Sequence, residues 1–446
     1  MVDNICAIAT PYGVGAISII RASGPDAINL VNKIFKGKDL TKVKSHTINY
    51  GHIMDNDEEI DEVLALVYLA PKSFDGENMV EISCHGGVYV TNQVLNTLLK
   101  NGFRLAERGE FSKRAFLNHK MDLTQAESIM DIISASNKIA LKSSNASLRS
   151  QTSKLIRSFR DKLLDILAKI EVNIDYPEYE DAVDVTHEYL RPIVLDLIEG
   201  MKKILKNSQI TTVAIHGIKT AIVGKPNVGK SSLLNMLLDE EKAIVSSYAG
   251  TTRDTVEGTL TLGNVTLHLI DTAGIHESDD YVESIGIERS KKAMEEADLV
   301  LLVIDSSKEL DEIDKKLLQE TEGKNRIIIG NKMDLEEKTN LPGMVYISAK
   351  NKEGLDELAL KIEEITKIDS IADMNGNYLN NTRQMGLMEK AMKSLLQAKE
   401  SMDLGMDISL IEIDIKNAFD YLGEITGEAN PDELITALFT KFCLGK

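Results

Sequence analysis

A glycine-rich segment at residues 224–231 has the residue types and spacing of a phosphate-binding loop. It reads GKPNVGKS, which fits the pattern G-x-x-x-x-G-K-[ST], and it lies between an apolar run (Thr220–Val223) and a helical run (Ser232–Leu238). The glycines allow backbone N–H groups to approach phosphates closely at a helix N-terminus. Lys230 would reach the β- and γ-phosphates, and the hydroxyl of Ser231 would ligate Mg²⁺. The segment therefore predicts a nucleoside triphosphate site.

Two later segments predict that the base is guanine. In NKMD at residues 331–334, the carboxylate of Asp334 can accept two hydrogen bonds from donors that guanine offers and adenine does not. A site built on such paired donors discriminates strongly between bases. Backbone N–H groups of SAK at residues 348–350 can read guanine O6.

Two segments between the loop and NKMD suit the γ-phosphate and its metal ion. Asp271 of DTAG (271–274) fits the outer coordination shell of Mg²⁺, and the backbone N–H of Gly274 can contact the γ-phosphate when GTP is bound. A threonine of GTTRD (250–254) can complete the metal coordination. Along the chain these five segments follow in the order GKPNVGKS, GTTRD, DTAG, NKMD, SAK, which identifies a GTPase. Lys230 and Asp271 are its candidate catalytic residues.

The residue that orients the attacking water differs from the one in familiar small GTPases. Those proteins carry a glutamine directly after DTAG, where this chain has Ile275. Asn227, inside the phosphate loop, offers an explanation, because in a related set of GTPases this asparagine accompanies a potassium ion that neutralises developing charge. A side chain that merely caps the turn is the alternative, and the residues alone leave both open.

The elements that must position these residues fall into several domains. A chain of 446 residues exceeds what one hydrophobic core usually supports. Strand-like and helical runs mix over residues 1–118 (strands at 16–21, 63–68 and 80–83, a helix at 90–100), which predicts an α+β domain. Residues 119–216 and 371–446 have helical spacing. Between them, residues 217–370 alternate buried strands with helices, which predicts a doubly wound parallel sheet inserted into a discontinuous helical domain.

The net charge of −19 is distributed unevenly among these domains. Residues 217–370 carry a net charge of −11, whereas residues 1–216 together carry a net charge of −3. The acidity therefore does not exclude a nucleic-acid partner, but it predicts that such a partner avoids the GTPase domain. Residues 132–160 carry six basic residues and no acidic one, at helical spacing. This stretch either follows a phosphate backbone or is an ordinary solvated helix face.

Several classes of protein and site are excluded or disfavoured. Three distant cysteines rule out a disulfide scaffold. No apolar run is long enough to span a bilayer, and the N-terminus lacks the pattern of a signal peptide, so we expect a cytoplasmic protein without a membrane partner. The pair Cys84 and His85 is better explained as a strand that enters a glycine turn than as a metal or nucleophile site. Cys443 is either a reactive thiol or a buried structural cysteine.

The whole chain resembles the MnmE (TrmE) family of tRNA-modification GTPases. Besides the GTPase segments, the resemblance depends on IATP (8–11), IIRASGP (19–25), CHGG (84–87), GEFSKRAF (109–116), KMDLTQAE (120–127) and the closing CLGK (443–446). It implies an N-terminal tetrahydrofolate-binding domain that forms a homodimer, a discontinuous helical domain and an inserted P-loop GTPase domain. It also implies a heterotetramer with the FAD- and NADH-dependent flavoprotein MnmG. Together the two proteins install a (carboxymethyl)aminomethyl group at C5 of the wobble uridine of tRNA.

The resemblance also implies a role for particular residues. The folate site would comprise Arg21, Glu81, Lys120 and Lys446, and would take 5-formyl- or methylene-tetrahydrofolate. Mg²⁺ would be held by Ser231 and Thr252, K⁺ would be lined by Asn227, Ser246, Tyr248 and Thr251, and Glu283 would activate water. The GTP contacts would be Asn227, Val228, Gly229, Lys230, Ser231, Ser232, Ser246, Ser247, Tyr248, Ala249, Gly250, Thr251, Thr252, Asp271, Thr272, Ala273, Gly274, Asn331, Lys332, Asp334, Ser348, Ala349 and Lys350.

Two other hypotheses compete with this one. The chain could be a GTP-switched ribosome-assembly factor that binds ribosomal RNA and modifies no base. Alternatively, residues 1–118 could be a dimerisation module without folate. Folate binding and the identity of the captured partner distinguish these possibilities.

Overall fold

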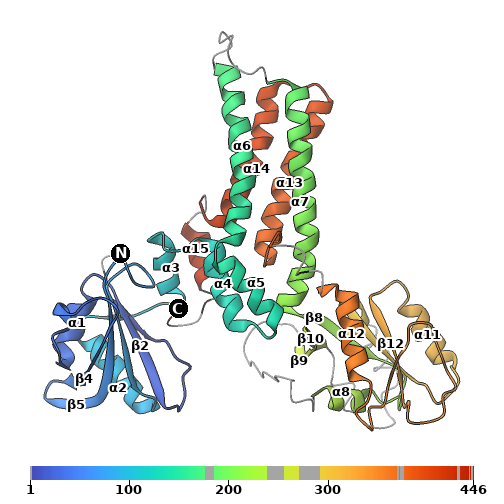
Figure 1. The fold of residues 1–446 in the computed structure, drawn as a ribbon, viewed down its shortest axis with the longest axis horizontal. Coiled ribbons are helices and arrows are strands. Elements are labelled where there is room, and N and C mark those ends of the chain that lie inside the picture. Colours follow the sequence, from blue (N-terminus) through green and yellow to red (C-terminus); the bar gives the residue numbers. More distant parts are fainter. Residues whose placement is uncertain are drawn as a thin grey trace. The chain divides into compact units, whose positions relative to one another are not determined.

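The computed structural model describes residues 3–175, 185–238, 256–270, 292–368, 371, 376–428, 432–440, 442 and 445. The chain divides into two compact units (Figure 1). The first comprises Met1–Met130 with Thr426–Lys446, and the second comprises Asp131–Ile425. Each is described by itself below. None of the helices within the described ranges is long and apolar enough to cross a bilayer.

The first unit is built on a seven-stranded sheet of order β3-β4-β5-β6-β2-β1-β7. All neighbouring strands are antiparallel except β1 and β7. The strands are β1 (Ile5–Ile8), β2 (Ile17–Ser23), β3 (Phe35–Gly37), β4 (Thr47–Asp55), β5 (Glu58–Tyr68), β6 (Met79–His85) and β7 (Arg104–Leu105). The predicted strands at 16–21, 63–68 and 80–83 are confirmed to within a few residues.

The two faces of this sheet are used differently. Alternate residues such as Ile20, Ile82 and Val67 pack with α1 (Ala27–Ile34) and α2 (Val88–Lys100) in one core. The intervening residues, among them Arg21 and Glu81, face the opposite side. The helix expected at 90–100 is therefore confirmed as α2, which packs with α1 against the first face (Figure 1). Buried residues such as Met79 and Phe111 form a smaller core on part of the second face.

A buried arginine holds α3 (Glu110–Leu117) in the first unit. Arg114 is only 1% exposed, and its guanidinium contacts Glu110 at 2.9 Å, Glu77 at 2.9 Å and Asp3 at 2.8 Å. Such a buried cation is tolerated because carboxylates surround it. The end of the chain packs on this helix, with α15 (Asp432–Phe439) placing the Phe439 ring 6.3 Å from that of Phe116.

Long helices form one part of the second unit. Their bounds are α5 (Lys138–Leu148), α6 (Gln151–Asp175), α7 (His187–His216), α13 (Thr382–Asp403) and α14 (Ile408–Thr426). Helix α4 (Leu123–Ser134) precedes them in the chain and lies mostly in the first unit, which extends to Met130. Residues from α6, α7, α13 and α14 share a single apolar core. Helices on both sides of the inserted segment therefore pack together, which confirms the discontinuous helical domain.

The inserted segment contains a six-stranded sheet of order β13-β12-β11-β8-β10-β9. All neighbours are parallel except β9 and β10. The strands are β8 (Ile218–Val223), β9 (Val256–Leu262), β10 (Val265–Ile270), β11 (Leu299–Asp305), β12 (Arg326–Asn331) and β13 (Val345–Ile347). Helices with bounds inside the described ranges include α8 (Lys230–Leu238), α11 (Glu312–Glu320) and α12 (Leu355–Thr366). Successive residues of β11 enter two different cores, so both faces of the sheet are covered. The doubly wound fold is confirmed.

Candidate active site

The phosphate loop lies where the predicted strand and helix meet. Strand β8 ends at Val223, helix α8 begins at Lys230, and the loop between them is held at the carboxyl edge of the sheet. Gly229 has a φ of +99°, and a Cβ there would lie 2.2 Å from the Nδ2 of Asn331, so only glycine fits. The ammonium of Lys230 donates to the carbonyls of Gly224 (2.8 Å) and Lys225 (2.9 Å) inside the loop.

Asn331 connects the three loops that form the nucleotide site. Its Nδ2 donates to the carbonyl of Val228 at 2.8 Å, and its Oδ1 accepts from the N–H groups of Lys332 (2.8 Å) and Ala349 (3.1 Å). The side chain is 3% exposed, so water competes little with these bonds. This one carboxamide fixes the phosphate loop, the NKMD segment and the SAK segment relative to one another.

Lys332 and Asp305 form a second bridge beside it. The Lys332 ammonium lies 2.7 Å from Oδ2 of Asp305 and 3.2 Å from the carbonyl of Asn227. Burial alone would raise the pKa of Asp305, but hydrogen bonds from Lys332 and Ser307 hold it below its ordinary value. Sequence analysis missed Asp305. Its signal was available, because an aspartate that ends a fully apolar strand lies at the carboxyl edge of the sheet.

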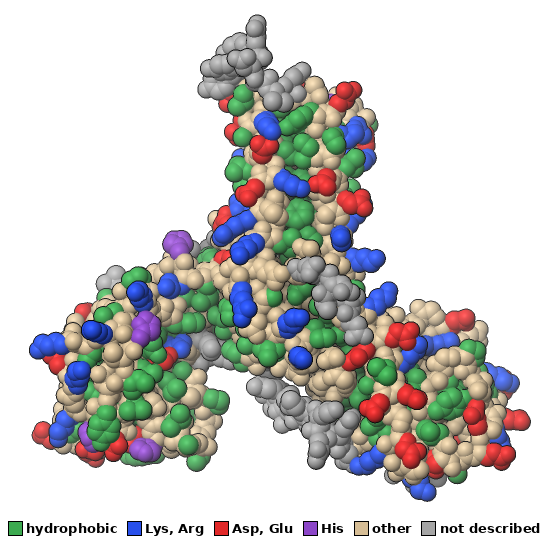
Figure 2. Space-filling model, in the orientation of Figure 1, with side chains coloured by type: hydrophobic (Ala, Val, Ile, Leu, Met, Phe, Trp, Pro, Cys, Tyr) green, Lys and Arg blue, Asp and Glu red, His purple; other side chains and the backbone are tan. Residues whose placement is uncertain are grey.

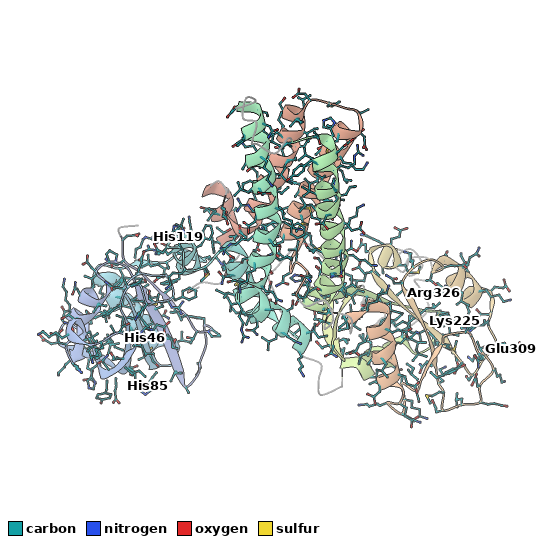
Figure 3. The ribbon with its side chains drawn as sticks, turned by 45° about the horizontal axis from the view of Figure 1, so that its top comes forward. His46, His85, His119, Lys225, Glu309 and Arg326 are labelled. Carbon is teal, nitrogen blue, oxygen red and sulfur yellow. The ribbon has the colours of Figure 1, made fainter. Side chains whose placement is uncertain are left out.

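Lys225 fastens the phosphate loop to α11. Its ammonium lies 2.8 Å from Asp311 and 2.6 Å from Asp314, and Figure 3 labels it. Asp311 caps α11 and accepts from the N–H groups of residues 313 and 314, so the loop is anchored to a fixed helix end. No sequence pattern predicts this contact, because its partners are more than 80 residues apart.

Ser348 orients the carboxylate that would read the base. Its hydroxyl donates to Oδ1 of Asp334 at 2.7 Å, and this bond lowers the pKa of Asp334. Asp334 is exposed to solvent, as a base-binding group in an open site must be. Ser348 was predicted to act through its backbone, whereas its side chain has this additional positioning contact.

Many predicted nucleotide and metal residues lie outside the described residues. They are the segment 246–252, the segment 271–274 and Glu283. They comprise the catalytic candidates Asp271 and Glu283, the Mg²⁺ candidate Thr252, and the K⁺ candidates Ser246, Tyr248 and Thr251. Lys446 and Cys443 also lie outside.

In the first unit, Arg21 and Glu81 form an ion pair on the face of the sheet opposite α1 and α2. They occupy directly opposite positions of β2 and β6. Nε and Nη2 of Arg21 donate to Oε1 of Glu81 at 2.9 and 2.7 Å, and the side chains are 13% and 16% exposed. Nη1 donates to the carbonyl of Gly445 at 3.2 Å, so the end of the chain reaches this pair. Lys120 donates to the carbonyl of Pro71 at 2.8 Å.

Aromatic side chains that sequence analysis missed surround this pair. The guanidinium of Arg21 lies 4.9 Å from the ring centre of Phe74 and 5.4 Å from that of Phe111. The Tyr68 hydroxyl lies 3.4 Å from Oε2 of Glu81, and burial together with that carboxylate raises the pKa of Tyr68. Only the fold brings these rings together, since they come from separate loops, strands and helices.

The Cys84 and His85 pair is an ordinary strand end, as the sequence favoured. Consecutive strand residues point to opposite faces, and Cys84 is buried whereas His85 is exposed and binds Asp61 at 2.8 Å (Figure 3). Burial raises the pKa of the Cys84 thiol. Within the described ranges no group of three or more histidine, cysteine, aspartate or glutamate side chains could hold a metal ion.

Comparison with known proteins matches two family models to consecutive parts of the chain. A family model described as MnmE helical domain matches residues 123–443, and one described as GTP-binding protein TrmE N-terminus matches residues 4–120. The tRNA modification GTPase MnmE of Acholeplasma laidlawii is 51% identical, with 100% of this chain and 99% of that protein covered. The chain belongs to the MnmE (TrmE) family of tRNA modification GTPases. Its MnmE relative in Ligilactobacillus salivarius is 49% identical over 100% of this chain and 98% of that protein.

Family membership establishes the coarse function. The chain is a GTP hydrolase of tRNA modification that uses GTP and Mg²⁺ and has tRNA as its substrate. Membership of this family argues against the alternative hypothesis that the chain is a ribosome-assembly factor. Among solved structures, the G domain of the T. maritima FeoB iron transporter is 32% identical over 33% of this chain and 98% of that chain, with a TM-score of 0.25.

The burial of Lys230 predicts a proton uptake when GTP binds. Burial lowers the pKa of this ammonium from its ordinary value of 10.5, and phosphates favour the charged form. As the pH rises toward the lowered pKa, the free protein loses the proton that binding requires, so GTP affinity falls. Calorimetry at about pH 9, in buffers of different ionisation enthalpy, measures the uptake.

The control for this measurement is Lys230→Ala, which leaves the ionisation of guanine itself unchanged. We expect weaker binding and a smaller proton uptake in this variant than in the wild type. The same uptake in both proteins would contradict the assignment.

Proposed function

We propose that this chain hydrolyses GTP to drive a conformational cycle in which a folate-borne carbon reaches the tRNA. In this proposal it acts with the flavoprotein MnmG to add a (carboxymethyl)aminomethyl group to C5 of the wobble uridine. We assign folate binding and dimerisation to residues 1–118, the helical domain to 119–216 and 371–446, and the GTPase domain to 217–370. The observation that carries the folate assignment is the Arg21–Glu81 pair with its aromatic neighbours.

The chemistry of this pair suits a pterin. A carboxylate accepts hydrogen bonds from adjacent ring donors, and Arg21 keeps Glu81 in the charged form that such acceptance needs. Phe74 and Phe111 supply flat apolar surfaces next to the pair. Because two nitrogens of Arg21 are used by Glu81, we assign Arg21 to positioning Glu81, and Lys120 with Lys446 to the glutamate carboxylates of folate.

The chain terminus supports the same proposal. Gly445 has a φ of +85°, and a Cβ there would lie 2.5 Å from the carbonyl oxygen of Ile8, so the tail passes too close to β1 for any other residue. This fixes the tail beside Arg21. Lys446 is the next residue along the chain, which supports its assignment to the folate site.

We expect Glu81→Gln and Arg21→Ala each to weaken 5-formyltetrahydrofolate binding about 10- to 100-fold. A hydrogen bond to a charged group contributes roughly 1.5–3 kcal/mol, which corresponds to that range in Kd. Isothermal titration measures it. Arg108→Ala is the matched control, because Arg108 is an exposed arginine of the same unit. Equal folate affinity in the wild type and both site variants would reject the assignment.

In the GTPase domain we assign water activation to Glu283 and charge neutralisation to a potassium ion, with Lys230 and Asp271 as further catalytic residues. Asn227 supports the potassium site. Its φ of +65° holds the residue in the left-handed region, and its side chain makes no hydrogen bond with any residue within the described ranges. A turn-capping side chain would have such a bond, so the amide oxygen is available to a cation.

We expect GTP turnover to be more than about tenfold faster in potassium than in sodium, because a fixed cation stabilises the charge of the transition state. Asn227→Gly should abolish that difference, since glycine tolerates the positive φ while the amide is lost. Asn56→Gly is the control, because Asn56 also has a positive φ (+55°) but lies in the other unit. Equal rates in the two salts with the wild-type protein would refute the potassium site.

Homodimer formation is supported by apolar side chains on the face of the first sheet opposite α1 and α2. Ile48 is 65% exposed, Tyr50 is 60% exposed and Leu64 is 43% exposed. Tyr50 and Leu64 are directly opposite on β4 and β5, so they form a continuous patch. Clustered apolar side chains of this kind mark a surface that another protein covers. We assign that surface to a second copy of the chain.

Light scattering during size-exclusion chromatography tests both partners. We expect the mass of a dimer for the chain alone and of a two-plus-two complex with the flavoprotein. Tyr50→Glu should halve the mass of the chain alone, because a charge would be buried in an apolar interface. Leu360→Glu, at a residue 66% exposed on α12, should not. A monomeric wild type, or no complex with the flavoprotein, would contradict the corresponding partner.

A further inference from the structure

Five basic side chains on α5 and the first turns of α6 are exposed to solvent. We name this surface the α5–α6 basic face, and it consists of Lys138, Lys142, Arg149, Lys154 and Arg157. Residues 132–160 include no aspartate or glutamate, so nothing in this stretch neutralises it. In Figure 2, Lys and Arg side chains gather over the region that Figure 1 draws as α5 and the start of α6.

The sixth basic residue of the predicted stretch has a different role. Arg160 is half-buried, and its guanidinium lies 4.2 Å from the ring centre of Phe419 on α14. This stacked contact stabilises the packing of α6. The sequence predicted six cations along this stretch. The structure corrects that number to five exposed cations, because Arg160 is half-buried.

None of the five cations forms an ion pair with any residue within the described ranges. Other cations on the same group of helices are paired, with Lys162 bound to Asp196 at 2.9 Å and Lys169 to Asp165 at 2.7 Å. A paired cation adds little to the electrostatic potential of the surface because its partner cancels its charge, whereas an unpaired cation attracts anions. The contrast within a single helix, α6, locates the positive potential at its N-terminal end.

The spacing of the cations suits an extended polyanion. Lys142 follows Lys138 by four residues on α5, and Arg149, the residue that caps the C-terminus of α5, follows Lys138 by eleven. Both separations are close to whole numbers of helical turns, which places the three on the same side of the helix axis. At about 1.5 Å per residue they span roughly 16 Å. Lys154 and Arg157 are three residues apart and share one side of α6. A line of cations this long exceeds what a single small anion occupies.

We propose that the α5–α6 basic face binds the sugar-phosphate backbone of the tRNA substrate. This rests on the role of the family in tRNA modification. Lysine and arginine contacts to phosphates set the position of a nucleic acid without reading its sequence. The acidic segment 217–370 repels the same ligand, so tRNA would bind the second unit at the α5–α6 basic face and away from that segment.

The test compares two double variants of the full-length chain that remove the same charge from the same helix. Lys154→Gln with Arg157→Gln removes two unpaired cations, and Lys162→Gln with Lys169→Gln removes two paired ones. Fluorescence anisotropy with a labelled tRNA transcript measures affinity at several salt concentrations. GTP hydrolysis without tRNA and thermal unfolding verify that both variants are folded.

We expect the first variant to bind tRNA at least about tenfold more weakly at 0.1 M salt. Its slope of log affinity against log salt should fall by about 1.4–1.8, because two phosphate contacts no longer release counterions. The second variant should resemble the wild type. A third variant, Lys138→Gln with Lys142→Gln, should reproduce the loss from α5.

Three results would overturn the proposal: unchanged affinity and slope in the first variant, an equal loss in the paired-cation control, or no tRNA binding by the wild type. Binding to vesicles rich in phosphatidylglycerol that only the first variant loses, with tRNA affinity unchanged, would assign the face to a membrane instead. Nucleoside analysis of tRNA from a complemented deletion strain reports the family function separately, since failure there by the wild type would concern tRNA modification itself.

Discussion

The nucleotide site depends on one buried carboxamide. Asn331 donates to the phosphate loop and accepts from the two loops that would read guanine, so it joins segments that are more than a hundred residues apart in the chain. Three hydrogen bonds from a side chain with 3% exposure lose little to water. The parallel sheet makes this arrangement possible, because the carboxyl ends of its strands bring these loops to one edge.

Around this carboxamide, charged side chains fix the loops from outside. Lys332 bridges Asp305 to the phosphate loop, and Lys225 joins the loop to the capped end of α11. None of these contacts reads the nucleotide. They restrict the backbone so that the N–H groups of the loop stay where phosphates need them, which is how a preorganised anion site avoids reorganisation on binding.

Two surfaces with opposite electrostatic character handle the anionic ligands. The GTPase domain is acidic overall, and in the proposed function its nucleotide is held by loop amides, Lys230 and metal ions. The α5–α6 basic face is positive because, among the residues that the structure describes, its cations have no carboxylate partner of the kind that neutralises Lys162 and Lys169. Whether a surface attracts an anion therefore depends on how its charges are paired locally, and the net charge of the chain does not show this.

The sequence by itself determined the fold class and the GTPase assignment, and it named Arg21 and Glu81 as site residues through the family resemblance, whereas their pairing across β2 and β6 came from the structure. What the sequence determined rests on local patterns: strand and helix periodicity, fixed motif spacing, or residues matched by family resemblance. The tertiary structure alone decided that Asp305 and Lys225 support the phosphate loop, that Phe74 and Phe111 flank Arg21, and which basic residues of 132–160 remain unpaired. These features are contacts between distant segments, and neither composition nor spacing encodes which side chains the packing of a fold brings within a few ångströms of each other.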